Sequence, residues 1–223
     1  MPGWDLASSE AALALAERHG PMVDAAVGVH PHHAAGIDES GWRHLESLAR
    51  DPRAAAVGEI GLDYFRNLSP PDVQRAALDR QLAIAREAAL PVLVHDRDAH
   101  EDATAALLAW PGPSGRPIRG VLHAFSGDAG MASRLVAAGF LVSFALPIAF
   151  RSATGPRAAA PGLPTGSFLV ETDAPYLGPD RERRNEPTTV LRVLAELAAL
   201  RDVPVRSLVT PVRAAYERLL ATA

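Results

Sequence analysis

Residues 54–59 read Ala-Ala-Ala-Val-Gly-Glu, a short apolar run that ends on a carboxylate. Three further runs have the same form and also end on a side chain that can hold a divalent metal: 91–95 (Pro-Val-Leu-Val-His), 120–123 (Gly-Val-Leu-His) and 167–173 (Ser-Phe-Leu-Val-Glu-Thr-Asp). Each run has the length and the β-branched content of a buried strand. Helical stretches separate most of them, and strands that alternate with helices are typical of a parallel sheet covered by helices.

The carboxyl ends of parallel strands share one face of the sheet, and ligands bind there. We therefore expect four side chains to converge at that face: Glu59, His95, His123 and Asp173. Taken alone, a histidine at a strand end is more often a structural residue than a ligand. A lone glutamate there could cap the next helix, and a lone aspartate could belong to a turn. The repetition over four strand ends is what favours a functional site.

Six strands are expected, at 22–29, 54–59, 91–95, 117–123, 140–144 and 167–172. Helices are expected at 8–19, 39–50, 70–89, 98–109, 128–138, 187–200 and 211–221, the last of them capped by Thr210 and Pro211. Residues 151–166 suit no single assignment, and a polar loop follows the sixth strand through Arg184. Because a (β/α)₈ barrel has eight strands and about 250 residues, this α/β chain is predicted to be such a barrel about one βα unit short.

The length of 223 residues predicts a single domain over residues 1–223. The net charge of −4 gives no global basic field of the kind that advertises nucleic-acid binding, although a local arginine cluster can still hold phosphate. Cysteine is absent and all 22 basic residues other than histidine are arginine, which excludes thiolate sites, disulfides, Schiff-base lysines and carbamylated lysines. No secretory signal or long apolar stretch is visible, so a cytoplasmic location is expected.

Two imidazoles and two carboxylates form a mixed nitrogen and oxygen donor set. Such a set suits Zn²⁺, Mn²⁺ or Co²⁺, and Mg²⁺ with more carboxylate and water. A carboxylate such as Glu59 can bridge two ions, and Asp173 can accept the proton of a metal-activated water. With cysteine and lysine absent, that water is the nucleophile the composition favours.

The order of the motifs resembles the TatD-type metal-dependent deoxyribonucleases over almost the whole chain. The motifs are Gly-Val-His-Pro-His (28–32), Gly-Glu-Ile-Gly-Leu-Asp-Tyr (58–64), Pro-Val-Leu-Val-His-Asp-Arg-Asp-Ala (91–99), Leu-His-Ala-Phe-Ser-Gly (122–127), Glu-Thr-Asp-Ala-Pro-Tyr-Leu (171–177) and Arg-Asn-Glu-Pro (184–187). The resemblance implies a (β/α)₈ metallo-hydrolase barrel that cleaves DNA, often from the 3′ end, with one or two ions of Mg²⁺, Mn²⁺ or Zn²⁺. It implies Glu59, His95, His123 and Asp173 as metal ligands, with Asp173 and Glu59 catalytic, and substrate contacts from His30, His32, Arg66, Arg97 and Arg184.

The chain departs from this family at its beginning. Most members start with a strand that carries a His-x-His pair, whereas Met1 matches a point near their second strand. The first βα unit is therefore expected to be missing, leaving an open sheet edge that a second copy of the chain could cover. Three functions stay open: a nuclease acting on DNA ends, a hydrolase of another ester or amide such as an aminoacyl-nucleic acid or a small molecule, and a barrel with weakened catalysis.

Overall fold

The computed structural model describes residues 1–178 and 184–221. Their contacts divide the chain into two compact units, Met1–Val121 with the last residues from Leu220, and Leu122–Leu219. Division into two compact units does not test whether residues 1–223 form one domain, so the single domain stays a prediction. Within the described residues, no helix combines the length and the apolar character that a membrane span requires.

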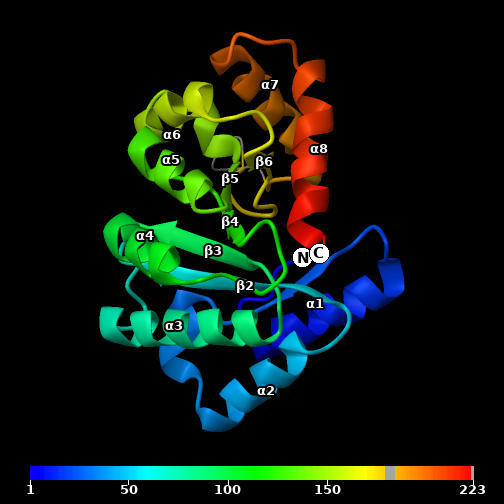
Figure 1. Cartoon of the computed structure of the whole chain (residues 1–223), viewed down its shortest axis with the longest axis vertical. Helices are drawn as coiled ribbons and strands as arrows, with labels where there is room; N and C mark the ends of the chain where they lie inside the picture. Colours follow the sequence, from blue (N-terminus) through cyan, green and yellow to red (C-terminus); the bar gives the residue numbers. More distant parts are fainter. Residues whose placement is uncertain (179–183, 222–223) are drawn as a thin grey trace. The chain divides into compact units, whose positions relative to one another are not determined.

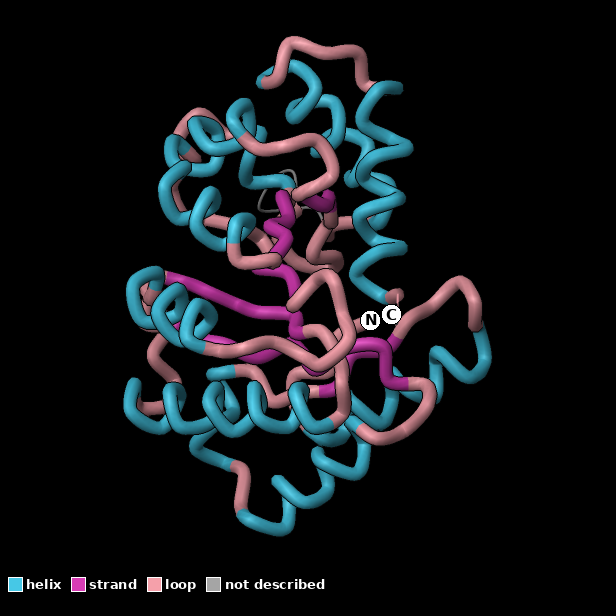
Figure 2. The backbone as a smooth tube through the Cα atoms, in the orientation of Figure 1, coloured by secondary structure: helices cyan, strands magenta, loops and turns pink. Residues whose placement is uncertain are grey.

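The first unit contains three parallel strands side by side (Figures 1 and 2), β1 (Ala25–Val27), β2 (Ala54–Asp63) and β3 (Val92–Arg97). Between them come α1 (Leu6–His19), the 3₁₀ helix η1 (Pro31–Gly36), α2 (Glu39–Ala49) and α3 (Pro71–Glu87), with α4 (His100–Ala109) after β3. β4 (Gly120–Leu122) contains the boundary between the units. The apolar residues of these strands form the core, with Val27, Val57 and Val94 fully inaccessible to solvent.

Helix α1 begins two residues before the predicted start. The Asp5 carboxylate accepts the backbone N–H of Ser8, and the Ser8 hydroxyl accepts the N–H of Asp5, which forms a capping box. Asp5 is therefore the N-cap, and Ser8 is the third helical residue.

The first residues of the chain lie along β1. Pro2 forms a parallel bridge with Ala26, whose N–H donates to the Met1 carbonyl at 2.9 Å and whose carbonyl accepts the Gly3 N–H at 2.8 Å. The Gly3 carbonyl also accepts the N–H of Glu59 at 2.7 Å. This short segment thus pairs with β1, and its hydrogen bond fixes the backbone of Glu59, a predicted site residue.

The second unit repeats the pattern. Strands β5 (Phe140–Phe144) and β6 (Phe168–Val170) pair in parallel, with α5 (Ala129–Ala137) before them and η2 (Leu146–Ala149), α6 (Thr154–Ala159) and η3 (Ala160–Gly162) between them. The chain ends with η4 (Pro187–Thr189), α7 (Val190–Leu200) and α8 (Arg206–Leu220). Phe140, Phe144 and Phe168 form its fully buried aromatic core, in which the ring of Phe144 meets that of Phe168 edge-on.

The six predicted strands are all present in the described residues, but the start of the last helix needs correction. The last helix does not start at Thr210 and Pro211: α8 begins at Arg206 and holds Pro211 inside it. The proline removes only one backbone hydrogen bond near the start of the helix, while Leu208, 2% exposed, extends the buried face upstream. The unassigned residues 151–166 contain α6 and η3.

Candidate metal centre

The strand β2 carries two carboxylates toward one histidine of β3. Glu59 sits where the register of β2 against β3 shifts, between Val57 and Ile60. Beyond the shift, Gly61 pairs with His95. A Cβ on Gly61 would collide with the His95 carbonyl oxygen, so only glycine allows this approach.

His95 lies between these two carboxylates. Its Nδ1 is 3.1 Å from Glu59 Oε1, and its Nε2 is 3.2 Å from Asp63 Oδ2. A neutral imidazole carries one proton, so it can donate to only one of the two carboxylates. A proton on Nε2, donated to Asp63, leaves the Nδ1 lone pair directed toward Glu59. A histidine that is held by a carboxylate on one nitrogen and ligates through the other is the usual arrangement at metal sites.

His30 completes the cluster of possible ligand atoms. One atom each of His30, Glu59 and His95 lie within 4.8 Å of one another, and the His30 Nε2 is 3.5 Å from Glu59 Oε1. However, the His30 Nδ1 accepts the backbone N–H of His32 at 3.2 Å. Burial lowers the pKa of His30, with the contact to Glu59 opposing it, which favours the neutral ring. A neutral ring whose Nδ1 accepts must carry its proton on Nε2, so His30 is a donor here.

Asp63 is buried and organises this part of the site. Its Oδ2 lies 2.7 Å from His32 Nε2, in addition to the contact with His95, and its Oδ1 accepts the N–H of Arg66 at 2.7 Å. Burial alone would raise the pKa of Asp63, but these hydrogen bonds outweigh it and hold the pKa below its usual value. Asp63 had no predicted role, because the strand was expected to end at Glu59 and continues to Asp63.

The second unit holds two of the predicted ligands. His123 follows β4, and its Nδ1 is 2.9 Å from Glu171 Oε1, which also accepts the N–H of Ala124 at 2.6 Å. Burial would raise the pKa of Glu171, but the contacts with His123 and Ala124 hold it lower. This carboxylate therefore orients the His123 ring, again a role that the sequence analysis did not assign. Asp173 stands two residues later with a φ of 58°, in the left-handed region.

The remaining predicted residues are exposed arginines. Arg66 and Arg97 lie at the carboxyl ends of β2 and β3. Arg184 is exposed next to the buried Asn185, whose amide donates to the carbonyl of Thr172. The part of the polar loop at 179–183 lies outside the described residues.

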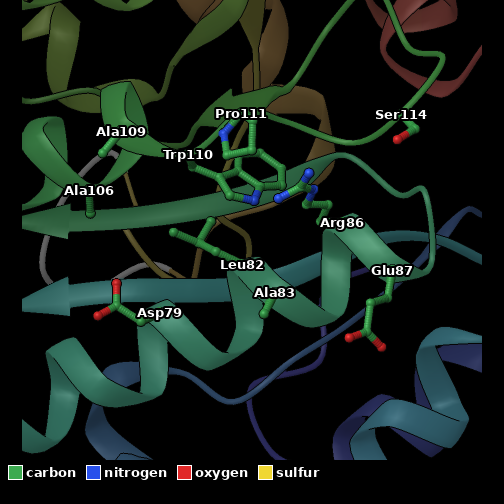
Figure 3. Close-up of a pocket in the computed structure, with 10 residues that line it drawn as sticks. All are labelled: Asp79, Leu82, Ala83, Arg86, Glu87, Ala106, Ala109, Trp110, Pro111 and Ser114. Carbon is green, nitrogen blue, oxygen red and sulfur yellow. The ribbon is translucent and has the colours of Figure 1, made fainter.

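A pocket of about 650 Å³ in the first unit contains none of these residues (Figure 3). It is formed by α3, the end of α4 and the loop that follows: Asp79, Leu82, Ala83, Arg86, Glu87, Ala106, Ala109, Trp110, Pro111 and Ser114. It has no histidine, so its chemistry differs from that of the cluster on β2 and β3.

Comparisons with known proteins agree with the motifs. The family model for TatD-related DNases matches residues 1–221. A protein named uncharacterized metal-dependent hydrolase YabD from Bacillus subtilis is 32% identical over 90% of this chain and 78% of its own length. A protein named 3′-5′ ssDNA/RNA exonuclease TatD from Enterobacter lignolyticus is 37% identical over 89% of this chain and 77% of its own length.

Solved structures support the same conclusion. The TatD homologue YjjV from Escherichia coli K12 has a TM-score of 0.90 at 31% identity and covers 99% of this chain and 85% of its own. A TatD family hydrolase from Entamoeba histolytica shares the fold at 17% identity, with a TM-score of 0.81 over 99% of this chain and 83% of its own. The predicted TIM-barrel-like fold of the metallo-hydrolase type is thus confirmed. The chain belongs to the TatD-related DNase family of metal-dependent hydrolases.

Proposed function

We propose that this protein is a metal-dependent phosphodiesterase that removes nucleotides from the 3′ end of single-stranded nucleic acid, with DNA as the substrate. The observation that carries the proposal is the placement of His95 between Glu59 and Asp63. Relatives named as 3′-5′ ssDNA/RNA exonucleases support the substrate class.

The residues fit a divalent ion. Glu59 and the Nδ1 of His95 would hold it in the first unit, and we propose His123 and Asp173 as further ligands, as the sequence analysis predicted. The donor set accepts one or two ions of Mg²⁺, Mn²⁺ or Zn²⁺. When bound, such an ion polarises the phosphoryl group and acidifies water.

The side chains divide the remaining work. The His30 Nε2–H can donate a hydrogen bond to a phosphate oxygen of the substrate. His32 is proposed as a second substrate contact, and its ring is held by Asp63. Arg66, Arg97 and Arg184 are proposed to bind the flanking phosphates. Asp173 is proposed to accept the proton of the attacking water.

The experiment is hydrolysis of 3′-labelled and 5′-labelled single-stranded DNA by the purified chain with Mg²⁺ or Mn²⁺. We expect shortening from the 3′ end that EDTA abolishes and that the variants Glu59→Gln and Asp173→Asn lose. Arg213→Gln, which breaks an exposed pair with Glu217, is the matched control and should cleave like the wild type. A folded protein that binds the ion but cleaves no nucleic acid would refute the proposal and favour another ester or amide as substrate.

A further inference from the structure

An aromatic ring is presented to solvent in the loop that leaves β2. Phe65 is 59% exposed, although phenylalanine is usually buried. The guanidinium of Arg97 lies over the ring, with its Cζ 4.1 Å from the ring centroid. More than half of the side chain stays open beside this stacked arginine.

The loop is held in place rather than loosely attached. The buried Gln74 donates to the carbonyls of Asp63 and Ser69 at 3.1 and 2.7 Å, and its Oε1 accepts the N–H of Asp63 at 2.8 Å. The residue before Phe65 is also fixed, because the Tyr64 N–H donates to the Arg97 carbonyl at 2.9 Å. A ligand that meets the ring therefore finds it already oriented.

The ring stands next to the proposed metal centre. Asp63, two residues before Phe65, contacts the His95 ring, and Arg97 is two residues after His95 on the paired strand. Arg66 follows Phe65 and is exposed like Arg97. Among the described residues, no ion pair ties either of these two guanidinium groups to a carboxylate. Their charge is therefore available to phosphates.

We propose that Phe65 is a stacking platform for a nucleobase of the substrate, with Arg97 supporting the ring and with Arg97 and Arg66 binding the adjacent phosphates. This inference rests on the proposed function, since it names what holds a single strand beside the centre. Stacking uses the face of a base and not its hydrogen-bonding edge, so every base is accepted. The platform thus favours unpaired nucleotides without selecting a sequence, and it serves DNA and RNA alike.

The test is binding of a labelled single-stranded oligonucleotide in EDTA, where no turnover occurs. Loss of one base stack weakens binding about 5- to 150-fold, which is the effect expected for Phe65→Ala. Phe65→Trp should bind at least as tightly as the wild type, and Phe65→Leu, which keeps apolar area without a ring, should bind like Phe65→Ala. Leu68→Ala is the matched control, because Leu68 is 62% exposed in the same loop.

An abasic nucleotide, scanned through the 3′-terminal positions, separates stacking from a general effect. At one position the abasic nucleotide should lower the affinity of the wild type but not the affinity of Phe65→Ala, because that variant has already lost the stack. The same result is expected with DNA and with RNA. Equal affinity of the wild type and Phe65→Ala, or an equal abasic penalty in both, would overturn the platform. So would a wild type that does not bind single strands. Binding with the expected pattern but without cleavage would refute the proposed nuclease activity and support the platform. Cleavage that Phe65→Ala leaves unchanged would support the nuclease activity and refute the platform.

Discussion

Replacing Asp63 by asparagine should weaken metal binding, although Asp63 is not itself a proposed ligand. The carboxylate accepts from three donors: His32 at 2.7 Å, His95 at 3.2 Å and the Arg66 N–H at 2.7 Å. Its two oxygens offer about four lone-pair sites, whereas the amide of asparagine offers one oxygen and adds two N–H donors. In at least one of the three contacts, the new amide N–H would then face another N–H donor, unless the partner shifts its proton and accepts instead.

The consequence for His95 follows from its second nitrogen. If the amide nitrogen faces the imidazoles, His95 must accept on Nε2 and carry its proton on Nδ1, which faces Glu59 at 3.1 Å. That nitrogen can then no longer ligate an ion. Loss of such an outer partner typically lowers metal affinity about 10- to 100-fold, which corresponds to about 1.4–2.7 kcal/mol.

Calorimetric titration of EDTA-stripped protein with Mn²⁺ measures this loss directly. Asp102→Asn is the matched control, because it also removes one negative charge but from an exposed carboxylate that accepts from Tyr64 and Arg75. Thermal unfolding of the ion-free proteins establishes that both variants are folded. A folded Asp63→Asn protein that binds Mn²⁺ as tightly as the wild type would refute the proposed orientation of His95.

Three further predictions concern the fold. Phe144→Ala, which empties a fully buried site, should lower the free energy of unfolding in urea by about 3–5 kcal/mol, and a loss below about 1 kcal/mol would contradict the packing. The pKa of Asp51 is lowered to about 2 by its hydrogen bond with Arg53. Because the folded pKa is depressed, the pair stabilises above the unfolded pKa of about 3.9 and loses its effect as the pH falls through about 2. Asp51→Asn should thus be less stable than the wild type at pH 7 but not at pH 2, and a difference that persists in acid would argue against the pair. Gly61→Ala should yield far less folded protein than Gly36→Ala by circular dichroism, because only the first adds a Cβ that meets backbone; equal yields would contradict the close approach of β2 and β3.

The strands were predictable because a strand buried on both faces is a nearly continuous apolar run, which is visible in one sequence. The end of β2 was not predicted correctly. The run was ended at Glu59, where a charged residue follows five smaller ones, but Ile60 and Leu62 are fully buried and the strand continues to Asp63. Asp63 was overlooked for that reason, although its side chain contacts both His32 and His95.

Of the two acids after β6, Asp173 was predicted as a ligand and Glu171 was given no role. Glu171 and Asp173 are two residues apart, so an extended chain would place both on the same side of the strand. The structure separates them, since Glu171 is held against His123 and the backbone turns into the left-handed region at Asp173. Such a turn depends on contacts elsewhere in the unit, which no local pattern reveals.

The two histidines nearest to Glu59 show why residue types alone cannot assign roles. Both reach the same carboxylate oxygen, His95 at 3.1 Å and His30 at 3.5 Å, and both offer a nitrogen to the same cluster of possible ligand atoms. Their other nitrogens distinguish them: that of His95 faces a carboxylate, which takes a proton, and that of His30 faces the backbone N–H of His32, which supplies one. The first ring is therefore prepared to give a lone pair to an ion, and the second to give a proton to a phosphate. The proposed division between metal ligand and substrate contact thus rests on one buried aspartate and one peptide group.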